Sequence, residues 1–105
     1  IAVLAKIGGW EYDFVNQSTY GSSNFEELYG GEIPLGNGIQ DFAALFCEED
    51  QDNVLKNLNE AITAGAQIDF EARLVTKNND LHWVRVIGKA EFARSRCTRL
   101  YGSVQ

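Results

Sequence analysis

The sequence predicts an α+β fold in which helices cover one face of an antiparallel β-sheet. Apolar side chains recur at helical spacing over residues 49–64, and they then alternate strictly with polar ones over residues 67–76. Strands are expected before the helices, and three more after them with no helix in between, so these last three are expected to form a meander. At 105 residues the chain is expected to be one domain, residues 1–105.

The first seven residues, IAVLAKI, are apolar and contain good helix formers. Because they are too apolar for a solvated tail, residues 1–7 are expected to form a cap helix on the sheet or a segment that contacts a second chain. The chain starts at Ile1 rather than methionine, which suggests a piece of a longer protein. The predicted domain core is residues 8–105.

The first strand is predicted over residues 9–15 (GWEYDFV), because aromatic and acidic side chains alternate there. Its three aromatic residues would face one side of the sheet and its two acidic residues the other. Residues 16–19 are expected to turn, and a short strand is expected near Tyr20.

Three helices are expected to follow. Ser23 and Glu26 form a capping-box pattern, which predicts a short helix that ends at Gly30. The spacing of apolar residues over 39–46 predicts a second short helix. The strongest helix is predicted over residues 49–64, and the acidic run 48–52 at its start is explained by the favourable helix dipole.

The C-terminal part is predicted to be a meander of three strands. Residues 67–76 and 81–92 form the first two, joined by a turn at Asn78–Asn79, since asparagine tolerates left-handed backbone. A third strand is predicted over residues 98–104. The segment 92–98 between the last two strands is expected to be a loop.

The charge of the chain is unevenly distributed and excludes some partners. The net charge is −6; the first 72 residues carry 13 acidic and two basic side chains, whereas residues 73–105 carry seven basic and two acidic ones. Because an acidic chain repels phosphate, nucleic acid is not an expected partner. No apolar run approaches the ~20 residues of a membrane span, so no membrane contact is expected.

The two cysteines, Cys47 and Cys97, are expected to be free thiols. Neither belongs to a CxxC pair, and the single histidine cannot complete the usual Cys/His zinc sets. Free thiols are typical of a reducing compartment, which predicts a cytoplasmic location. No metal site is predicted, since the acidic run 48–52 lacks the spacing and the glycine of a calcium loop.

Five segments of the chain, taken in order, resemble the PAS family, in its bacterial sensory-box branch with a C-terminal PAC motif. The segments are AKIGGWEYDF, SSNFEELYG, FCEEDQDNV, FEARLVTKNNDLHWVRVIG and RLYGSVQ. In the third, Asp50 stands at a position where the family nearly always has aspartate. Glu48 and Gln51 depart from the family's usual proline and arginine, Asn78–Asn79 replaces Asp-Gly, and the segment 92–98 lacks the common glycine.

The resemblance implies a five-stranded antiparallel sheet with helices on one face, and a regulatory domain rather than an enzyme. It also implies a place within a larger bacterial-type signalling protein: a histidine kinase of a two-component system, or a cyclic-dinucleotide cyclase (a diguanylate cyclase) or phosphodiesterase. The effector domain would follow the last strand in the same chain. Signalling would then be a shift between two arrangements of the sheet and the termini.

Two sets of candidate site residues result. The interior between the long helix and the meander is where PAS relatives bind small molecules, and a filled core without a cavity is the alternative. The pocket candidates are Leu55, Leu58, Ile62, Phe70, Ala72, Leu74, Val84, Val86 and Leu100. On the outer sheet face an exposed tryptophan needs cover, either from residues 1–7 or from a homodimer partner, and the resemblance favours the dimer. The dimer-face candidates are Ile1, Leu4, Trp83 and Arg85.

Three functions stay open: a ligand sensor, a ligand-free dimerisation and relay module, and a small cone-shaped enzyme of the isomerase type. The enzyme would use Asp13 or Asp69, but alternation places both on the outer face, and no catalytic residue is predicted. Haem is disfavoured because haem-binding relatives take their axial histidine from the long helix, where residues 49–64 have none. Flavin is disfavoured because Cys47 does not stand in the Asn-Cys-Arg motif; any ligand would be an unknown small molecule.

Overall fold

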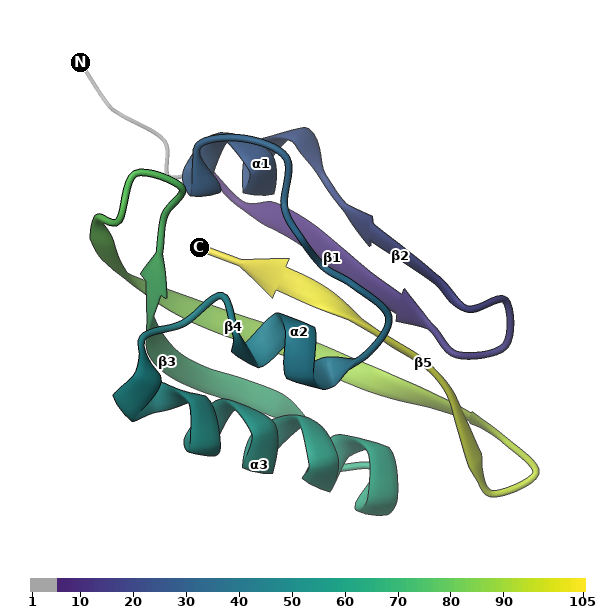
Figure 1. Cartoon of the computed structure of the whole chain (residues 1–105). Coiled ribbons are helices and arrows are strands. Elements are labelled where there is room, and N and C mark those ends of the chain that lie inside the picture. The colour runs from purple at the N-terminus through teal and green to yellow at the C-terminus, as the bar shows by residue number, and fades with distance from the viewer. Residues whose placement is uncertain (1–5) are drawn as a thin grey trace.

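The structure is a computed structural model, which describes residues 6–105. It contains five strands and three helices in the described part of the chain (Figure 1). In chain order they are β1 (Gly8–Asp13), β2 (Ser18–Gly21), α1 (Ser23–Tyr29), α2 (Ile39–Ala43), α3 (Glu48–Ala64), β3 (Ile68–Val75), β4 (Leu81–Ala93) and β5 (Arg96–Val104). The strands form one sheet in the order β2-β1-β5-β4-β3, and every neighbouring pair is antiparallel. The predicted α+β class and five-stranded antiparallel sheet are confirmed.

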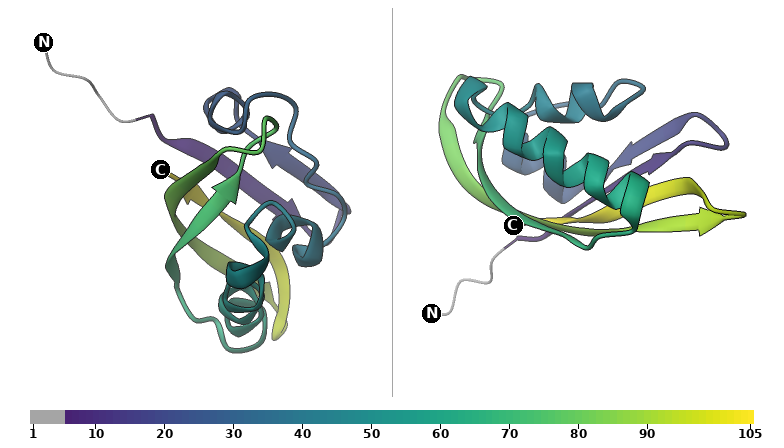
Figure 2. Two further views of the ribbon diagram at one scale, coloured as in Figure 1. Left: turned by 60° about the vertical axis from the view of Figure 1, so that its left-hand side comes forward. Right: turned by 90° about the horizontal axis from the view of Figure 1, so that it is seen from below.

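All three helices lie on one face of the sheet, which curves around them (Figure 2). The C-terminal strand β5 lies in the middle of the sheet, between β1 and β4, so its backbone is bonded on both sides. The meander β3-β4-β5 was predicted from alternation. The pairing of β1 with β5 joins residues about ninety positions apart, and no local pattern specifies it.

The inner face of the sheet and the helices form one core. Alternation puts the buried positions of β3 on one face, and they pack against the apolar stripe of α3, which contains Val54, Leu58 and Ala61. The opposite face of the sheet carries the charged residues. The helix α3 spans 17 residues and ends at Gly65, which adopts left-handed backbone with φ of 70°.

Two glycines allow β4 and β5 to approach each other in the middle of the sheet. Gly88 and Gly102 are directly paired, and a Cβ atom added to Gly102 would lie 1.9 Å from the Ile87 carbonyl oxygen. A Cβ atom on Gly88 would lie 2.8 Å from the Trp10 ring. Only glycine fits at these two paired positions, because a Cβ atom on either strand would overlap neighbouring atoms.

Several predicted boundaries were wrong. The N-cap of α1 is Ser22, whose hydroxyl accepts a hydrogen bond from Phe25 N, so the predicted capping box at Ser23 is out of register by one residue. The first strand ends at Asp13, because this carboxylate accepts hydrogen bonds from the next turn. Residues 6 and 7 are neither helical nor in a strand, and the remainder of the predicted 1–7 segment lies outside the described residues.

The segment 92–98 is not a loop. The strands β4 and β5 continue to a two-residue turn at Arg94–Ser95, where both residues have positive φ. A bulge follows in β5, where the pairing shifts from Glu91–Arg99 to Phe92–Cys97. The extra residue, Thr98, reverses the alternation, so Cys97 packs against the core rather than facing outward.

Among the helices of residues 6–105, none is long and apolar enough to cross a bilayer.

Candidate functional site

The nine pocket candidates lie together, between α3 and the inner face of the meander. Seven of them are buried, and Leu55 and Ile62 on α3 are half-buried at the margin of the core. Five hollows on the described part of the molecule are lined by other residues. A ligand at these nine positions therefore stays a prediction.

Aromatic rings fill the interior between the short helices and the sheet. Phe42 of α2 lies at their centre, with ring centroids 5.1 Å from Trp10 and 5.5 Å from Phe46. Tyr12 donates its hydroxyl to the Leu35 carbonyl at 2.8 Å, and burial raises its pKa, so the phenol stays neutral. Within residues 6–105, every fully buried side-chain nitrogen or oxygen has a hydrogen-bond partner. No unpaired polar group in the described interior marks the position of a ligand.

The outer face of the sheet carries the other candidates, Trp83 and Arg85. Trp83 is 67% exposed, and the guanidinium of Arg73 lies over its ring at 5.3 Å from the centroid. Arg85 forms a bidentate ion pair with Asp69, in which both N···O distances are 2.9 Å. This pairing raises the pKa of Arg85 and lowers that of Asp69. Ile1 and Leu4 lie outside the described residues.

The C-terminal end of the chain lies beside this face. Gln105 donates its backbone N–H to the Arg85 carbonyl at 3.0 Å, and Arg85 N donates to the Gln105 carbonyl at 2.7 Å. Gln105, the residue after the end of β5, is thus bonded to a strand position two residues from Trp83. This pairing was not predicted from the sequence, since it depends on the register between β4 and β5.

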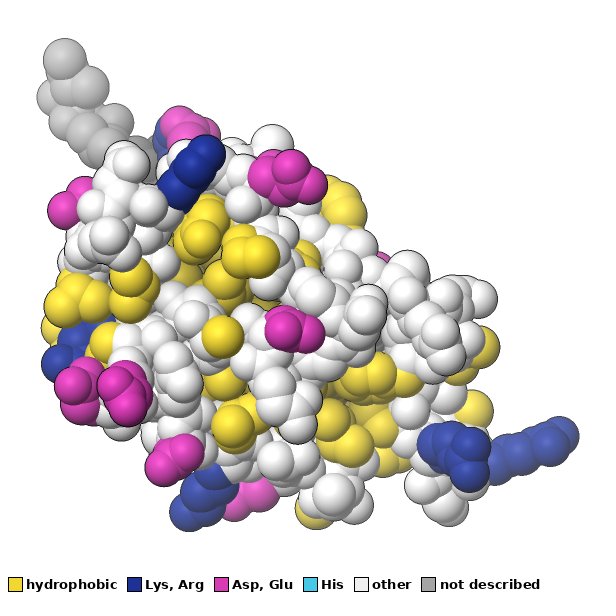
Figure 3. Space-filling model, in the orientation of Figure 1, with side chains coloured by type: hydrophobic (Ala, Val, Ile, Leu, Met, Phe, Trp, Pro, Cys, Tyr) yellow, Lys and Arg dark blue, Asp and Glu magenta, His cyan; other side chains and the backbone are white. Residues whose placement is uncertain are grey.

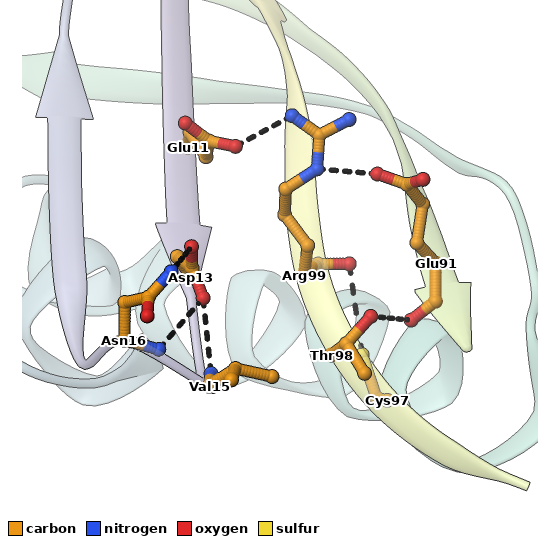
Figure 4. A network of polar contacts seen from close by, with 8 residues as sticks. All are labelled: Glu11, Asp13, Val15, Asn16, Glu91, Cys97, Thr98 and Arg99. Atoms are coloured by element: carbon orange, nitrogen blue, oxygen red, sulfur yellow. Dashed lines mark hydrogen bonds and ion pairs between the residues drawn. The ribbon is translucent and has the colours of Figure 1, made fainter. Parts of the chain in front are cut away.

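A second polar network crosses β1, β5 and β4 on the outer face (Figure 4). Arg99 donates to Glu11 at 2.5 Å and also to Glu91, and its guanidinium lies 4.0 Å from the centroid of the Tyr101 ring. Both pairings raise the pKa of Arg99. Among residues 6–105, ion pairs therefore involve three of the seven basic residues in the C-terminal third.

The two carboxylates considered for an enzyme do not have the environment of a general acid. Asp13 accepts hydrogen bonds from Val15 N and from the backbone and side chain of Asn16, which lower its pKa (Figure 4). Asp69 is exposed and its pKa is lowered by Arg85. Catalytic carboxylic acids commonly need a raised pKa in a closed cleft, and neither residue has one.

The cysteines are free, and burial raises the pKa of both thiols. Cys47 lies at the N-terminus of α3, and Cys97 of β5 packs against the core on the helix side of the sheet. Within the part of the chain that the structure describes, no three His, Cys, Asp or Glu side chains gather as metal ligands.

The principal contact of Asp50 was not predicted from the sequence. Its carboxylate lies in the acidic run at the start of α3. It binds Arg73 of β3 through two oxygens (2.9 and 3.0 Å) and also accepts from Arg73 N (2.8 Å). Arg73 thus contacts Trp83 on the outer face and Asp50 at the start of α3. The resemblance to the PAS family did mark Asp50 as a position where aspartate is usual. No feature of the sequence indicated that Arg73 is its partner.

The order of strands and helices and the position of the helices on one face are those of a known family. The family model described as "PAS fold" matches residues 18–104. The chain belongs to the PAS fold family. No protein of curated function matches the sequence.

Solved structures share the fold of this PAS domain over nearly all of its length. A sensory box histidine kinase/response regulator from Burkholderia thailandensis E264 matches with a TM-score of 0.79 at 23% identity, over 96% of this chain and 76% of that chain. The N-terminal domain of a diguanylate cyclase with PAS/PAC sensor from Marinobacter aquaeolei matches with a TM-score of 0.81 at 19% identity, over 95% and 94%. A LOV protein from Rhodobacter sphaeroides matches with a TM-score of 0.73 at 12% identity, over 94% and 58%. At these identities the matches show the PAS fold alone.

The departures from the family pattern fall outside the core of this PAS domain. Glu48 is exposed at the start of α3, and Asn79 adopts the positive φ of 66° that the β3–β4 turn requires. Gln51 donates its side-chain amide to the Phe46 carbonyl at 3.0 Å and so closes the turn before α3. The fold therefore accommodates each of these residues locally.

Proposed function

We propose that this PAS domain is the sensory and relay module of a larger signalling protein, such as a histidine kinase or a cyclic-dinucleotide cyclase or phosphodiesterase. It relays its signal as a homodimer, through the outer face of the sheet. The observation that carries the proposal is the pairing of Gln105 with Arg85, which joins the residue after β5 to the strand that contains Trp83.

The outer face has the composition of a protein interface. Trp83 is a large exposed aromatic residue with Arg73 stacked on it, and tryptophan and arginine are enriched among interface hot spots. The Arg85–Asp69 ion pair beside it supplies a polar rim. In a twofold symmetric dimer the outer face of one subunit packs against the same face of the other, so Trp83 contributes to the interface from both subunits.

The relay depends on the position of β5. Because β5 is bonded to β1 on one side and to β4 on the other, a change in the twist of the outer face moves the end of β5 with it. Two dimer arrangements would then hold the segment after Gln105 in two orientations, and the stimulus would shift their populations. The effector domain follows β5 in the full-length protein and carries any enzymatic activity, in a cytoplasmic setting.

Ligand binding in the core is the second candidate. The nine pocket candidates are apolar and lie between α3 and the meander, and the walls of most small-molecule sites are largely apolar. A ligand would have to displace packed side chains, among them the ring of Phe42 or Phe70, because aromatic residues occupy this space.

Native mass spectrometry of the purified domain, at micromolar concentration, tests both candidates. We expect a dimer for the wild type and a monomer for Trp83→Glu, since two buried carboxylates at the anchor would repel each other. The matched control is Val15→Glu, which introduces the same charge at an exposed apolar residue in the β1–β2 turn.

A monomeric wild type contradicts the relay by dimerisation, and so does a dimer that survives Trp83→Glu. Additional mass of one small molecule per chain would instead support the ligand sensor. A thermal unfolding curve for each variant establishes that Trp83→Glu changes association and not folding.

A further inference from the structure

The outer edge of β2 is free, and the register of the sheet shows which of its backbone groups are unpaired. Ser22 N donates to the Gly9 carbonyl at 2.9 Å, so Gly9 and Ser22 are a hydrogen-bonded pair. In an antiparallel ladder such pairs alternate with pairs that exchange no hydrogen bonds. Within β2, Thr19 and Gly21 therefore direct their N–H and C=O groups away from β1. No other segment of the described chain bonds to them.

A hollow of about 490 Å³ adjoins this edge. It is lined by β2, by Glu26 of α1 and by the segment 32–36. This segment lies between α1 and α2 in the chain (Figure 1). Glu26 and Glu32 line it, and within residues 6–105 neither carboxylate belongs to an ion pair. Further acidic side chains are spread over this face of the molecule (Figure 3).

We propose that the β2 edge binds an extended peptide segment of a partner protein, which adds to the sheet as a sixth strand. Free edge strands are templates for pairing with another chain, and such complexes take their affinity from main-chain hydrogen bonds. Thr19 and Gly21 offer two donors and two acceptors, which is enough to hold three residues of an extended chain.

The side chains around the edge specify the peptide. Thr19 and Gly21 face the helix side of the sheet, since they are paired with Tyr12 and Trp10, which are buried there. Peptide side chains directly opposite them point to the same side, towards Glu26 and Glu32. The residue between points to the outer face, where it meets the exposed ring of Tyr20. The preferred segment is therefore basic–apolar–basic.

The test is an NMR titration of the ¹⁵N-labelled domain with a blocked peptide of alternating valine and lysine. We expect saturable binding, with the largest amide shifts at Thr19 and Gly21. The double variant Glu26→Gln/Glu32→Gln should weaken binding about threefold to tenfold, as two exposed ion pairs are lost. The matched control is Glu48→Gln/Glu60→Gln, which removes the same charge from exposed positions of α3 and should leave the affinity unchanged.

A second peptide tests the main-chain contacts and requires no change to the protein. N-methylation of the two lysine amides removes the donors that would face the edge while both charges remain, and we expect binding to be lost. Equal binding of the methylated peptide would overturn the proposal, as would an absence of shifts at millimolar peptide or shifts centred elsewhere. If the Thr19 and Gly21 amides shift with protein concentration alone, the occupant is a second copy of the chain and the peptide proposal fails.

Discussion

Asp50 at the start of α3 holds Arg73 on the edge strand of the sheet. Its two oxygens accept from Arg73 Nε at 3.0 Å and Nη2 at 2.9 Å, and one of them also accepts from Arg73 N at 2.8 Å. Two backbone hydrogen bonds also join the segment before α3 to β3: Cys47 N donates to the Arg73 carbonyl, and Val75 N donates to the Leu45 carbonyl. The C-terminal half of β3 is therefore covered, whereas β2 keeps a free edge.

Asp50→Ala should lower the free energy of unfolding by about 2 kcal/mol, because the half-buried guanidinium and the N–H of Arg73 lose their acceptor. Urea unfolding monitored by tryptophan fluorescence measures the change. The control is Asp52→Ala in the next turn, an exposed residue with no ion-pair partner among residues 6–105, which should change stability by less than about 0.5 kcal/mol. Equal effects of the two substitutions would contradict the role of Asp50.

The same contact predicts a dependence of stability on pH. Arg73 holds the pKa of Asp50 far below its ordinary value of 3.8, so the unfolded chain takes up the proton first as the solution is acidified. The contribution of Asp50 is complete at neutral pH and declines as the pH falls below about 5 towards the lowered pKa. Unfolding measured from pH 7 to pH 2 should therefore show a steeper loss of stability for the wild type than for Asp50→Asn, and parallel curves would refute this.

Gly102→Ala should destabilise the domain severely, by about 3 kcal/mol, because its Cβ would overlap the backbone of β4 at Ile87 and Gly88. Gly9→Ala is the matched control on the neighbouring strand, where the nearest atom to an added Cβ is 3.8 Å away. Thermal unfolding by circular dichroism compares the two variants. If the Gly102→Ala and Gly9→Ala variants unfold at the same temperature, β4 and β5 do not lie as close together at Gly102 as the structure shows.

The turn at the tip of the β4–β5 hairpin can be improved. Arg94 and Ser95 have φ values of 52° and 65°, the left-handed backbone that suits Asn-Gly in a two-residue hairpin. Arg94→Asn/Ser95→Gly should therefore stabilise the domain by about 1 kcal/mol. As a control, Ser103→Gly in the extended part of β5 should destabilise it. A rise in the unfolding midpoint for the turn variant alone is the expected result.

Alternation and helical spacing were sufficient to predict the type and order of the elements, because both patterns are read from neighbouring residues. The inner positions of β3 were assigned in this way, and so was the exposed side of Trp83. Alternation alone does not give the side that Cys97 faces, because one extra residue in β5 reverses the pattern. A bulge depends on how two strands fit together, and a single strand carries no sign of it.

For the candidate site too, some features follow from the sequence and others only from the tertiary structure. The sequence by itself determined that an apolar interior faces the long helix and that a charged outer face contains an exposed tryptophan, because these follow from local periodicity. Only the tertiary structure decided that Asp50 binds Arg73, 23 residues away, that Gln105 pairs with Arg85, and that aromatic rings occupy the interior. Such contacts join distant parts of the chain, and their partners are chosen by packing and strand register, which no local pattern encodes.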